Sequence, residues 1–262
     1  PFERRLSCIF SETDEILGPL ANGNHSGPAL FEIITHPRLL RLIESFIGPE
    51  IIASSAYRVR PKIPGMARGV VPWHQDSAYF STYCDRSLII TCWIPLVDAT
   101  VENGCLEVLP RAHHGQVVRH YTDGPNGYLV IDGSDLPRTE KPLAVPVPVG
   151  GVLLLTNRTP HCSTSNDSDV VRWCIDLRYQ DAKTPNNVGE SPREFSYERP
   201  GTEISCYPPE ADFVVQSVQH PESVVRLAAE FDRIRKSYEQ SPPPAPSVFQ
   251  NRDWISHDMR AN

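Results

Sequence analysis

Residues 71–77 read Val71-Pro72-Trp73-His74-Gln75-Asp76-Ser77, and the interpretation of the whole chain starts from this stretch. In an extended segment, residues i and i+2 point the same way, so the His74 imidazole and the Asp76 carboxylate can meet at one metal ion. One more histidine from a facing strand would complete a set of two histidines and one carboxylate. That set leaves three coordination positions open and suits non-haem Fe(II) enzymes that use O2. Alone, the pair is equally compatible with a polar turn in a surface loop, so the context decides.

The composition indicates a β-rich globular domain and argues against several other classes. A length of 262 residues fits one large domain or at most two small ones. The chain has 26 prolines, about twice the usual share, and short apolar runs, which favour strands and loops over a helical bundle. A net charge of −7 without a basic block argues against nucleic acid as a partner. The apolar runs are far shorter than the ~18 residues of a membrane span, so no membrane partner is expected.

Cysteine usage predicts a reducing compartment. The chain has 7 cysteines, an odd number, and no Cys-x-x-Cys motif. This pattern argues against a disulfide framework or a zinc ribbon and favours a cytoplasmic protein. Because the sequence starts at Pro1, an earlier targeting segment stays an open alternative.

The predicted elements form a series of short strands between helical segments. Residues 28–47 read as two helices, the second beginning at Pro37. Residues 221–238 read as an amphipathic helix. Strands are predicted at 51–59, 74–76, 88–96, 105–109, 143–149, 152–155 and 170–179, with long loops at 111–140 and 181–212. We therefore expect one mainly β domain over 1–262 with flanking helices and a double-stranded β-helix (jelly-roll, cupin-like) core at about 51–180.

Two later residues fit the chemistry suggested by the His-x-Asp pair. His161 follows the strand 152–155, at the place where a jelly-roll brings a late strand back beside an early one. Arg172 lies on the polar face of the strand 170–179, and its guanidinium fork suits a carboxylate. Taken singly, His161 could equally be a hydrogen-bonded structural histidine, and Arg172 a surface residue.

Several stretches together resemble one known family in order and spacing. They span roughly residues 51–180 and are Trp73-His74-Gln75-Asp76, Trp93-Ile94-Pro95-Leu96-Val97-Asp98-Ala99-Thr100, Glu102-Asn103-Gly104-Cys105-Leu106-Glu107-Val108-Leu109-Pro110, Thr159-Pro160-His161-Cys162-Ser163, and Arg172. The chain resembles the phytanoyl-CoA dioxygenase-like family of Fe(II)/2-oxoglutarate-dependent oxygenases.

The resemblance implies an enzyme with iron, 2-oxoglutarate and O2. The implied roles are iron ligation by His74, Asp76 and His161, binding of the distal 2-oxoglutarate carboxylate by Arg172 with Ser163 beside it, and lining of the cosubstrate pocket by Gln75 and Trp93. Turnover would release succinate and CO2 and oxidise a small organic molecule by hydrogen abstraction. We expect hydroxylation in particular, with desaturation and rearrangement as alternatives, and a secondary metabolite is among the candidate substrates. Whether the chain forms a homo-oligomer stays an open question.

The chain departs from the family pattern after Leu-Pro. It has Arg111-Ala112-His113-His114 where the family usually has Gly-Ser-His, so we expect that loop to meet the substrate differently. A second basic contact to 2-oxoglutarate has two candidates, Arg58 and Lys62.

Two non-enzymatic interpretations stay open at this point. One is a metal-free or zinc-bound β-helix that binds a small molecule without turnover. The other is a subunit of a hetero-oligomeric oxygenase whose partner supplies catalysis. Metal-dependent consumption of 2-oxoglutarate by the purified chain separates both from an enzyme.

Overall fold

Helices lie at both ends of the described chain. The computed structural model describes residues 26–54, 57–80, 82–125, 128–138, 140–182, 212–240, 252 and 254–258. The two predicted N-terminal helices are present as α3 (Pro28–Ile34) and α4 (Pro37–Ile47), each starting with a proline, whose fixed φ suits the first helical turn. The C-terminal helix is α5 (Ala228–Gln240). Short 3-10 helices are η1 (Ala67–Gly69), η2 (Asp76–Tyr79), η3 (Thr82–Arg86), η4 (Ala112–His114) and η7 (Pro221–Ser223).

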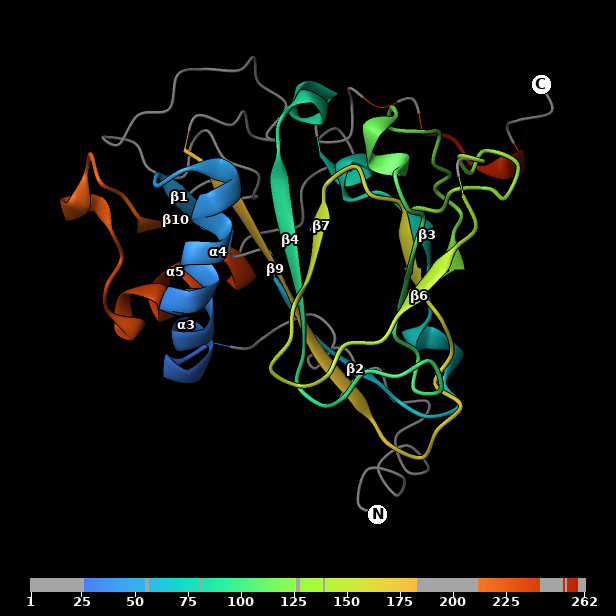
Figure 1. The fold of residues 1–262 in the computed structure, drawn as a ribbon, viewed down its shortest axis with the longest axis horizontal. Coiled ribbons are helices and arrows are strands. Elements are labelled where there is room, and N and C mark those ends of the chain that lie inside the picture. Colours follow the sequence, from blue (N-terminus) through green and yellow to red (C-terminus); the bar gives the residue numbers. More distant parts are fainter. Residues whose placement is uncertain are drawn as a thin grey trace.

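The strands form two antiparallel sheets. The larger sheet has the order β10 (Phe213–Gln216), β1 (Ile51–Ala53), β9 (Arg172–Asp181), β4 (Ile89–Pro95) and β7 (Leu153–Thr156), and β2 (Arg58–Lys62) also pairs with β9. The smaller sheet has the order β3 (Val71–His74), β8 (His161–Ser163), β5 (Leu106–Val108) and β6 (Leu143–Val145). The helices lie together beside the larger sheet, with the smaller sheet on its other side (Figure 1). The predicted mainly β fold with a double-stranded β-helix core is confirmed.

Strand β9 separates the outer core from the interior of the β-helix. Its outward residues Ile175, Leu177 and Tyr179 are buried in an apolar cluster with residues of α3, α4 and α5. The Tyr179 hydroxyl donates a hydrogen bond to the carbonyl of Ile34 (2.7 Å), which ties α3 to the sheet. Full burial of such side chains stabilises the fold by about 1.5–3 kcal/mol each. Because side chains alternate along a strand, the even-numbered residues of β9 point inward, as the sequence predicted.

Several predicted element boundaries are wrong. The predicted strand 51–59 is two separate strands, β1 and β2. The C-terminal helix begins at Ala228 and not at Pro221, because the backbone N–H of Val225 donates to the carbonyl of Val214 (3.0 Å) and holds this segment against β10. Most of the predicted loop 181–212 lies outside the described residues, and β10 after it was not predicted. No helix in the described part of the chain combines the length and apolar character that crossing a bilayer requires.

Candidate active site

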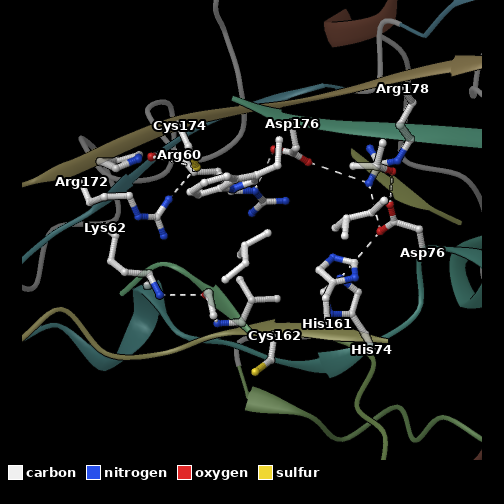
Figure 2. Close-up of a pocket in the computed structure, with 18 residues that line it drawn as sticks. Arg60, Lys62, His74, Asp76, His161, Cys162, Arg172, Cys174, Asp176 and Arg178 are labelled. Atoms are coloured by element: carbon white, nitrogen blue, oxygen red, sulfur yellow. Dashed lines mark hydrogen bonds and ion pairs between the residues drawn. The ribbon is translucent and has the colours of Figure 1, made fainter. Parts of the chain in front are cut away.

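A cavity between the two sheets collects most of the residues that the sequence singled out. Figure 2 shows its lining, with a cluster of basic side chains at one end and a pair of histidines at the other. The lining includes Arg60, Lys62, His74, Asp76, Thr91, Trp93, His161, Ser163, Arg172, Cys174, Asp176 and Arg178.

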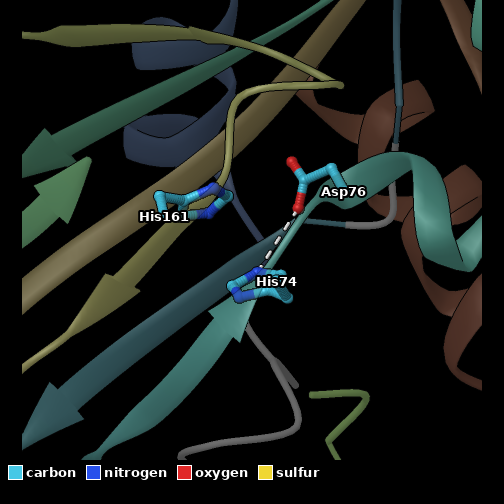
Figure 3. Close-up of side chains that lie close together, drawn as sticks. All are labelled: His74, Asp76 and His161. Carbon is cyan, nitrogen blue, oxygen red and sulfur yellow. Dashed lines mark ion pairs between the residues drawn. The ribbon is translucent and has the colours of Figure 1, made fainter. Parts of the chain in front are cut away.

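The three predicted metal ligands converge at one point. Strands β3 and β8 pair antiparallel with His74 directly opposite His161, so both imidazoles lie on the same face. Asp76 is the first residue of η2 and not a strand residue, but Gln75 before it is extended (φ −115°, ψ 136°), which turns Asp76 to the side of His74. One ligand atom from each of the three residues lies within 4.8 Å of the other two (Figure 3). Within the described residues, no second group of three metal-binding side chains converges in this way.

Backbone hydrogen bonds orient both imidazoles for metal binding. The Nδ1 atoms of His74 and His161 lie 2.8 Å from the carbonyl of Pro72 and 2.9 Å from that of Thr159. A carbonyl can only accept, so Nδ1 carries the proton and the lone pair is on Nε2. Burial, with a smaller contribution from the neighbouring His161, lowers the pKa of His74 to about 3, so His74 is neutral at physiological pH. A neutral imidazole with a free Nε2 is the form that binds a metal ion.

Asp76 is ionised and held on both carboxylate oxygens. Burial alone would raise the pKa of Asp76, but the nearby Arg178 and the two histidines outweigh it and lower the pKa below its usual range. The Thr91 hydroxyl donates to Oδ2 (2.5 Å), and Nη2 of Arg178 donates to Oδ1 (3.3 Å). The carboxylate is therefore fixed in charge and orientation.

The basic end of the cavity is built for a carboxylate. The Arg172 side chain is buried, and its Nη1 and Nη2 donate to Cys174 Sγ (2.7 Å) and the Gly104 carbonyl (3.0 Å). Its Nε is buried without a hydrogen-bond partner among the described residues. A thiol is a weak acceptor for a cation, so a bound carboxylate would complete the pairing of this guanidinium.

Lys62 is the second basic group at this end, and of the two candidates only Lys62 lines the cavity. Its ammonium donates to Ser163 Oγ (2.8 Å) and to the Thr164 carbonyl. Burial, with a smaller contribution from the adjacent Arg172, lowers the pKa of Lys62 to about 7. Ser163 Oγ also accepts from the Val71 N–H (3.1 Å), which leaves its own hydroxyl proton for an incoming carboxylate. Arg58 does not line the cavity.

Gly104 makes the close approach of these basic groups possible. Its φ is +79°, and a Cβ here would lie 2.6 Å from the Ser165 carbonyl oxygen and 2.7 Å from Cδ of Lys62. Glycine is thus required both by the backbone conformation and by the packing against the lysine. The same residue provides the carbonyl that holds Arg172.

Of the two residues predicted to line the cosubstrate pocket, Trp93 lines the cavity and Gln75 does not. Trp93 lines the cavity, with the Arg172 guanidinium carbon 5.1 Å from its ring centroid. Gln75 does not line it, because alternation along the extended segment turns its side chain away from the side of His74 and Asp76. The predicted pocket-lining role of Gln75 is therefore wrong.

Gln75 instead joins three backbone segments behind the site. Its amide nitrogen donates to the carbonyls of Arg158 (2.7 Å) and Gln116 (3.3 Å), and its amide oxygen accepts from Val118 N–H (2.9 Å). Its own N–H donates to Nε2 of His120 (3.0 Å). Burial lowers the pKa of His120 to about 4, so its ring is neutral and can accept. Gln75 lies between two candidate ligands, and these hydrogen bonds fix its position in the chain. No sequence motif predicted this role.

Replacing Gln75 with leucine, a side chain of similar size without polar atoms, should lower the stability of the protein. Leucine leaves the Val118 N–H and two carbonyls unpaired in the interior, at about 1–3 kcal/mol for each buried group. We expect the midpoint of urea unfolding to fall and iron affinity to fall with it. Urea denaturation and anaerobic iron titration measure the two effects. An unchanged unfolding midpoint in Gln75→Leu would contradict this role.

The fold is a double-stranded β-helix, and its cavity combines a buried set of two histidines and one carboxylate with a basic end suited to a carboxylate. Comparison of folds agrees, since the structure of the apo form of ThoJ, described as a non-heme monooxygenase, superposes with a TM-score of 0.63. That match covers 96% of this chain and 88% of the other at 16% sequence identity. The family model of phytanoyl-CoA dioxygenase (PhyH) matches residues 12–174, more than half of the sequence. The chain belongs to the phytanoyl-CoA dioxygenase family, whose enzymes use Fe(II), 2-oxoglutarate and O2.

Curated relatives show how much of the chain is shared. Phytanoyl-CoA dioxygenase domain-containing protein 1 of Danio rerio is 31% identical over 167 residues, which are 61% of this chain and 55% of that protein. The peroxisomal phytanoyl-CoA dioxygenase of Homo sapiens is 35% identical over 92 residues, 35% of this chain and 27% of the relative. The chain thus spans about half the length of the Danio rerio relative and a smaller share of the human one.

Proposed function

We propose that this chain is an Fe(II)- and 2-oxoglutarate-dependent oxygenase that hydroxylates a small organic molecule. The observation that carries the proposal is the pairing of two sites in one cavity. A buried set of two histidines and one carboxylate lies at one end, and at the other lies a buried arginine whose Nε has no hydrogen-bond partner in the described part of the chain. A protein that only binds metal has no use for the second site, and a protein that only binds a carboxylate has none for the first.

The residues have separate tasks in this reaction. His74, Asp76 and His161 would hold Fe(II) on one face and leave the opposite face for ligands. Arg172, Lys62 and Ser163 would bind the distal carboxylate of 2-oxoglutarate and thereby orient its 2-oxo acid end toward the histidines. When bound, iron with 2-oxoglutarate and O2 supplies the oxidant, and 2-oxoglutarate leaves as succinate and CO2.

Polar groups beyond the metal ligands indicate where a substrate would lie. Arg60 lines the cavity, donates to Asp176 (3.1 Å) and to the Tyr128 hydroxyl (3.2 Å), and keeps a third of its side chain exposed. Tyr128 belongs to the segment 111–140, which the sequence indicated as a long functional loop. We propose that a substrate with hydrogen-bonding groups meets Arg60 and Asp176 at this opening.

The decisive test is turnover of 2-oxoglutarate by the purified chain. We expect succinate to form only when Fe(II) and O2 are present, and a metabolite screen scored by succinate release to identify substrates. Absence of 2-oxoglutarate consumption with every metabolite would favour the binding-protein alternative, and consumption that is independent of iron would contradict the proposed iron chemistry. Activity only after addition of a second protein would favour the subunit alternative.

The enzyme should hydroxylate and should not halogenate. Relatives that halogenate lack the carboxylate ligand, and a halide takes the vacated position. Here Asp76 is present, and Thr91 and Arg178 hold both of its oxygens. An added chloride would meet a filled position and like-charge repulsion. Turnover in excess chloride or bromide, followed by mass spectrometry of the products, should show no halogenated product.

The companion variant is Asp76→Gly, which opens the position beside Arg178. We expect mainly loss of activity, because the residues around the metal site were not arranged to hold a halide. Halogenated product from the unmodified chain would show that Asp76 leaves the metal during turnover, and would overturn the prediction.

For the setting of the enzyme we propose a small-molecule substrate and a reducing compartment such as the cytoplasm. In support of the compartment, Cys84, Cys92, Cys105, Cys162 and Cys174 are free thiols and buried. A homo-oligomer is compatible with this proposal.

A further inference from the structure

Arg252 and Trp254, which we call the C-terminal segment, lie against the turn that carries Asp76. Arg252 donates from Nε to the carbonyl of Phe80 (2.9 Å) and from Nη2 to that of Ser77 (2.8 Å). It also forms a two-pronged ion pair with Asp85, in which Nη1 lies 2.8 Å from Oδ2. The Arg252 side chain is only 5% exposed. One arginine therefore joins both ends of the short segment that follows the candidate ligand.

We propose that Arg252 is a positioning residue that holds Asp76 in place for metal binding. This inference rests on the proposed function, because it assigns a role toward the same metal site. Residues 76–79 form a single 3-10 turn, and a turn of this length has few hydrogen bonds of its own. Its carbonyls at Ser77 and Ala78 accept from Arg252 and from Trp254. The turn is thus held mainly by groups distant in sequence.

The guanidinium suits this place better than any other side chain would. Two backbone carbonyls and one carboxylate converge on it from different directions, and only arginine offers donors in a fixed planar fork. Asp85 balances its charge, so the buried cation does not need Asp76 as its counter-ion. A lysine could reach one of these acceptors at a time.

Trp254 anchors the same segment on its other side. Its Nε1 donates to the Ala78 carbonyl (3.0 Å), and its ring lies 5.2 Å from the ring of His120. His120 in turn accepts the N–H of Gln75, the residue before Asp76. The segment therefore bonds directly to the backbone after the candidate ligand and reaches the backbone before it through His120.

The opposite face of the turn is already attached to the β-helix. The Ser77 N–H donates to the Asn157 carbonyl (2.8 Å), and the Asn157 amide donates to Ser77 Oγ (2.9 Å). Asn157 lies between β7 and β8, the strand that carries His161. With Arg252 on one side and Asn157 on the other, the distance between Asp76 and His161 is set by two contacts and not by the turn alone.

The test compares Arg252→Ala and Arg252→Lys with the unmodified chain. We expect Arg252→Ala to weaken Fe(II) binding by about tenfold to 100-fold in anaerobic titration, as observed for residues that orient metal ligands. Arg252→Lys should recover only part of the affinity. In the metal-free protein, hydrogen exchange of the amides at 76–80 should become faster in Arg252→Ala. The KM for 2-oxoglutarate should stay within about twofold, because Arg172 and Lys62 are unchanged.

A matched control separates positioning from general stability. Ile43→Ala removes a fully buried side chain of the helix core, far from the cavity, and should lower the unfolding temperature at least as much. We expect it to leave iron affinity and exchange at 76–80 unchanged. If Arg252→Ala does not fold, Trp254→Phe removes the Ala78 hydrogen bond while keeping an aromatic ring at this position, and it should give a smaller loss of the same kind.

Two results would overturn the role of Arg252. One is iron affinity in Arg252→Ala equal to that of Ile43→Ala at similar stability, and the other is unchanged exchange at 76–80. Failure of the proposed function appears separately, as absence of iron binding in the unmodified chain. In that case the exchange measurement still decides whether Arg252 holds the turn.

Discussion

His161→Ala abolishes succinate formation and removes most of the bound iron, while the protein stays folded. This result is expected because the variant leaves only His74 and Asp76 at the site, and two ligands hold Fe(II) far more weakly than three. The change deletes a buried ring that packs against the facing His74, with ring centroids 4.2 Å apart, and its hydrogen bond to the Thr159 carbonyl. The hydrogen bond that ties α3 to the larger sheet is left intact, so the fold should persist. Iron content after gel filtration, together with turnover and circular dichroism, measures the three effects.

His74→Ala and Asp76→Ala should behave alike. His114→Ala is the matched control, because His114 is an exposed histidine in η4 and does not line the cavity. It should keep full iron and full turnover. Retention of both by His161→Ala would show that the third ligand lies elsewhere.

Arg172→Ala should raise the KM for 2-oxoglutarate by roughly 30-fold or more, since loss of one partner of a buried charge pair costs about 2–5 kcal/mol. Among the described residues, the guanidinium has a buried Nε without a hydrogen-bond partner, and its other nitrogens donate to a thiol and a carbonyl. Arg172→Lys should rescue part of the affinity, because an ammonium cannot form the two-pronged contact. Steady-state kinetics with varied 2-oxoglutarate, at saturating iron, is the measurement.

The control for Arg172 is Arg226→Ala, which removes an exposed arginine that donates to the Pro221 carbonyl. Its KM should be unchanged. If Arg172→Ala also leaves the KM unchanged, the carboxylate binds elsewhere. Arg178 is the next arginine on the strand, but it lies against Asp76, so Lys62 becomes the stronger candidate.

Local rules of the sequence predicted much of the site. The spacing of His74 and Asp76 predicted that they share a side, because one extended residue separates them. The alternation of apolar and polar residues along 170–179 predicted which face of the strand meets the cavity and placed Arg172 there. Both predictions depend on neighbours in the chain, and they survived although Asp76 begins a 3-10 turn and the strand begins later than expected.

Other features depend on residues that the chain brings together only in three dimensions. Gln75 looked like a pocket residue, but the pairing of β3 with β8 turns it toward backbone groups 41 to 83 positions away. Lys62 became the second basic contact because β2 lies beside β9, opposite Arg172.

By itself, the sequence determined the ligand pair, the β-helix and the family, because strand alternation, helix-starting prolines and motif spacing act over a few residues. Only the tertiary structure decided what holds those ligands. Arg252 lies 175 positions from Ser77 in the chain, and no periodicity or motif connects the two. Hydrogen bonds between such distant groups form only after the sheets have closed, so they cannot be derived from local patterns.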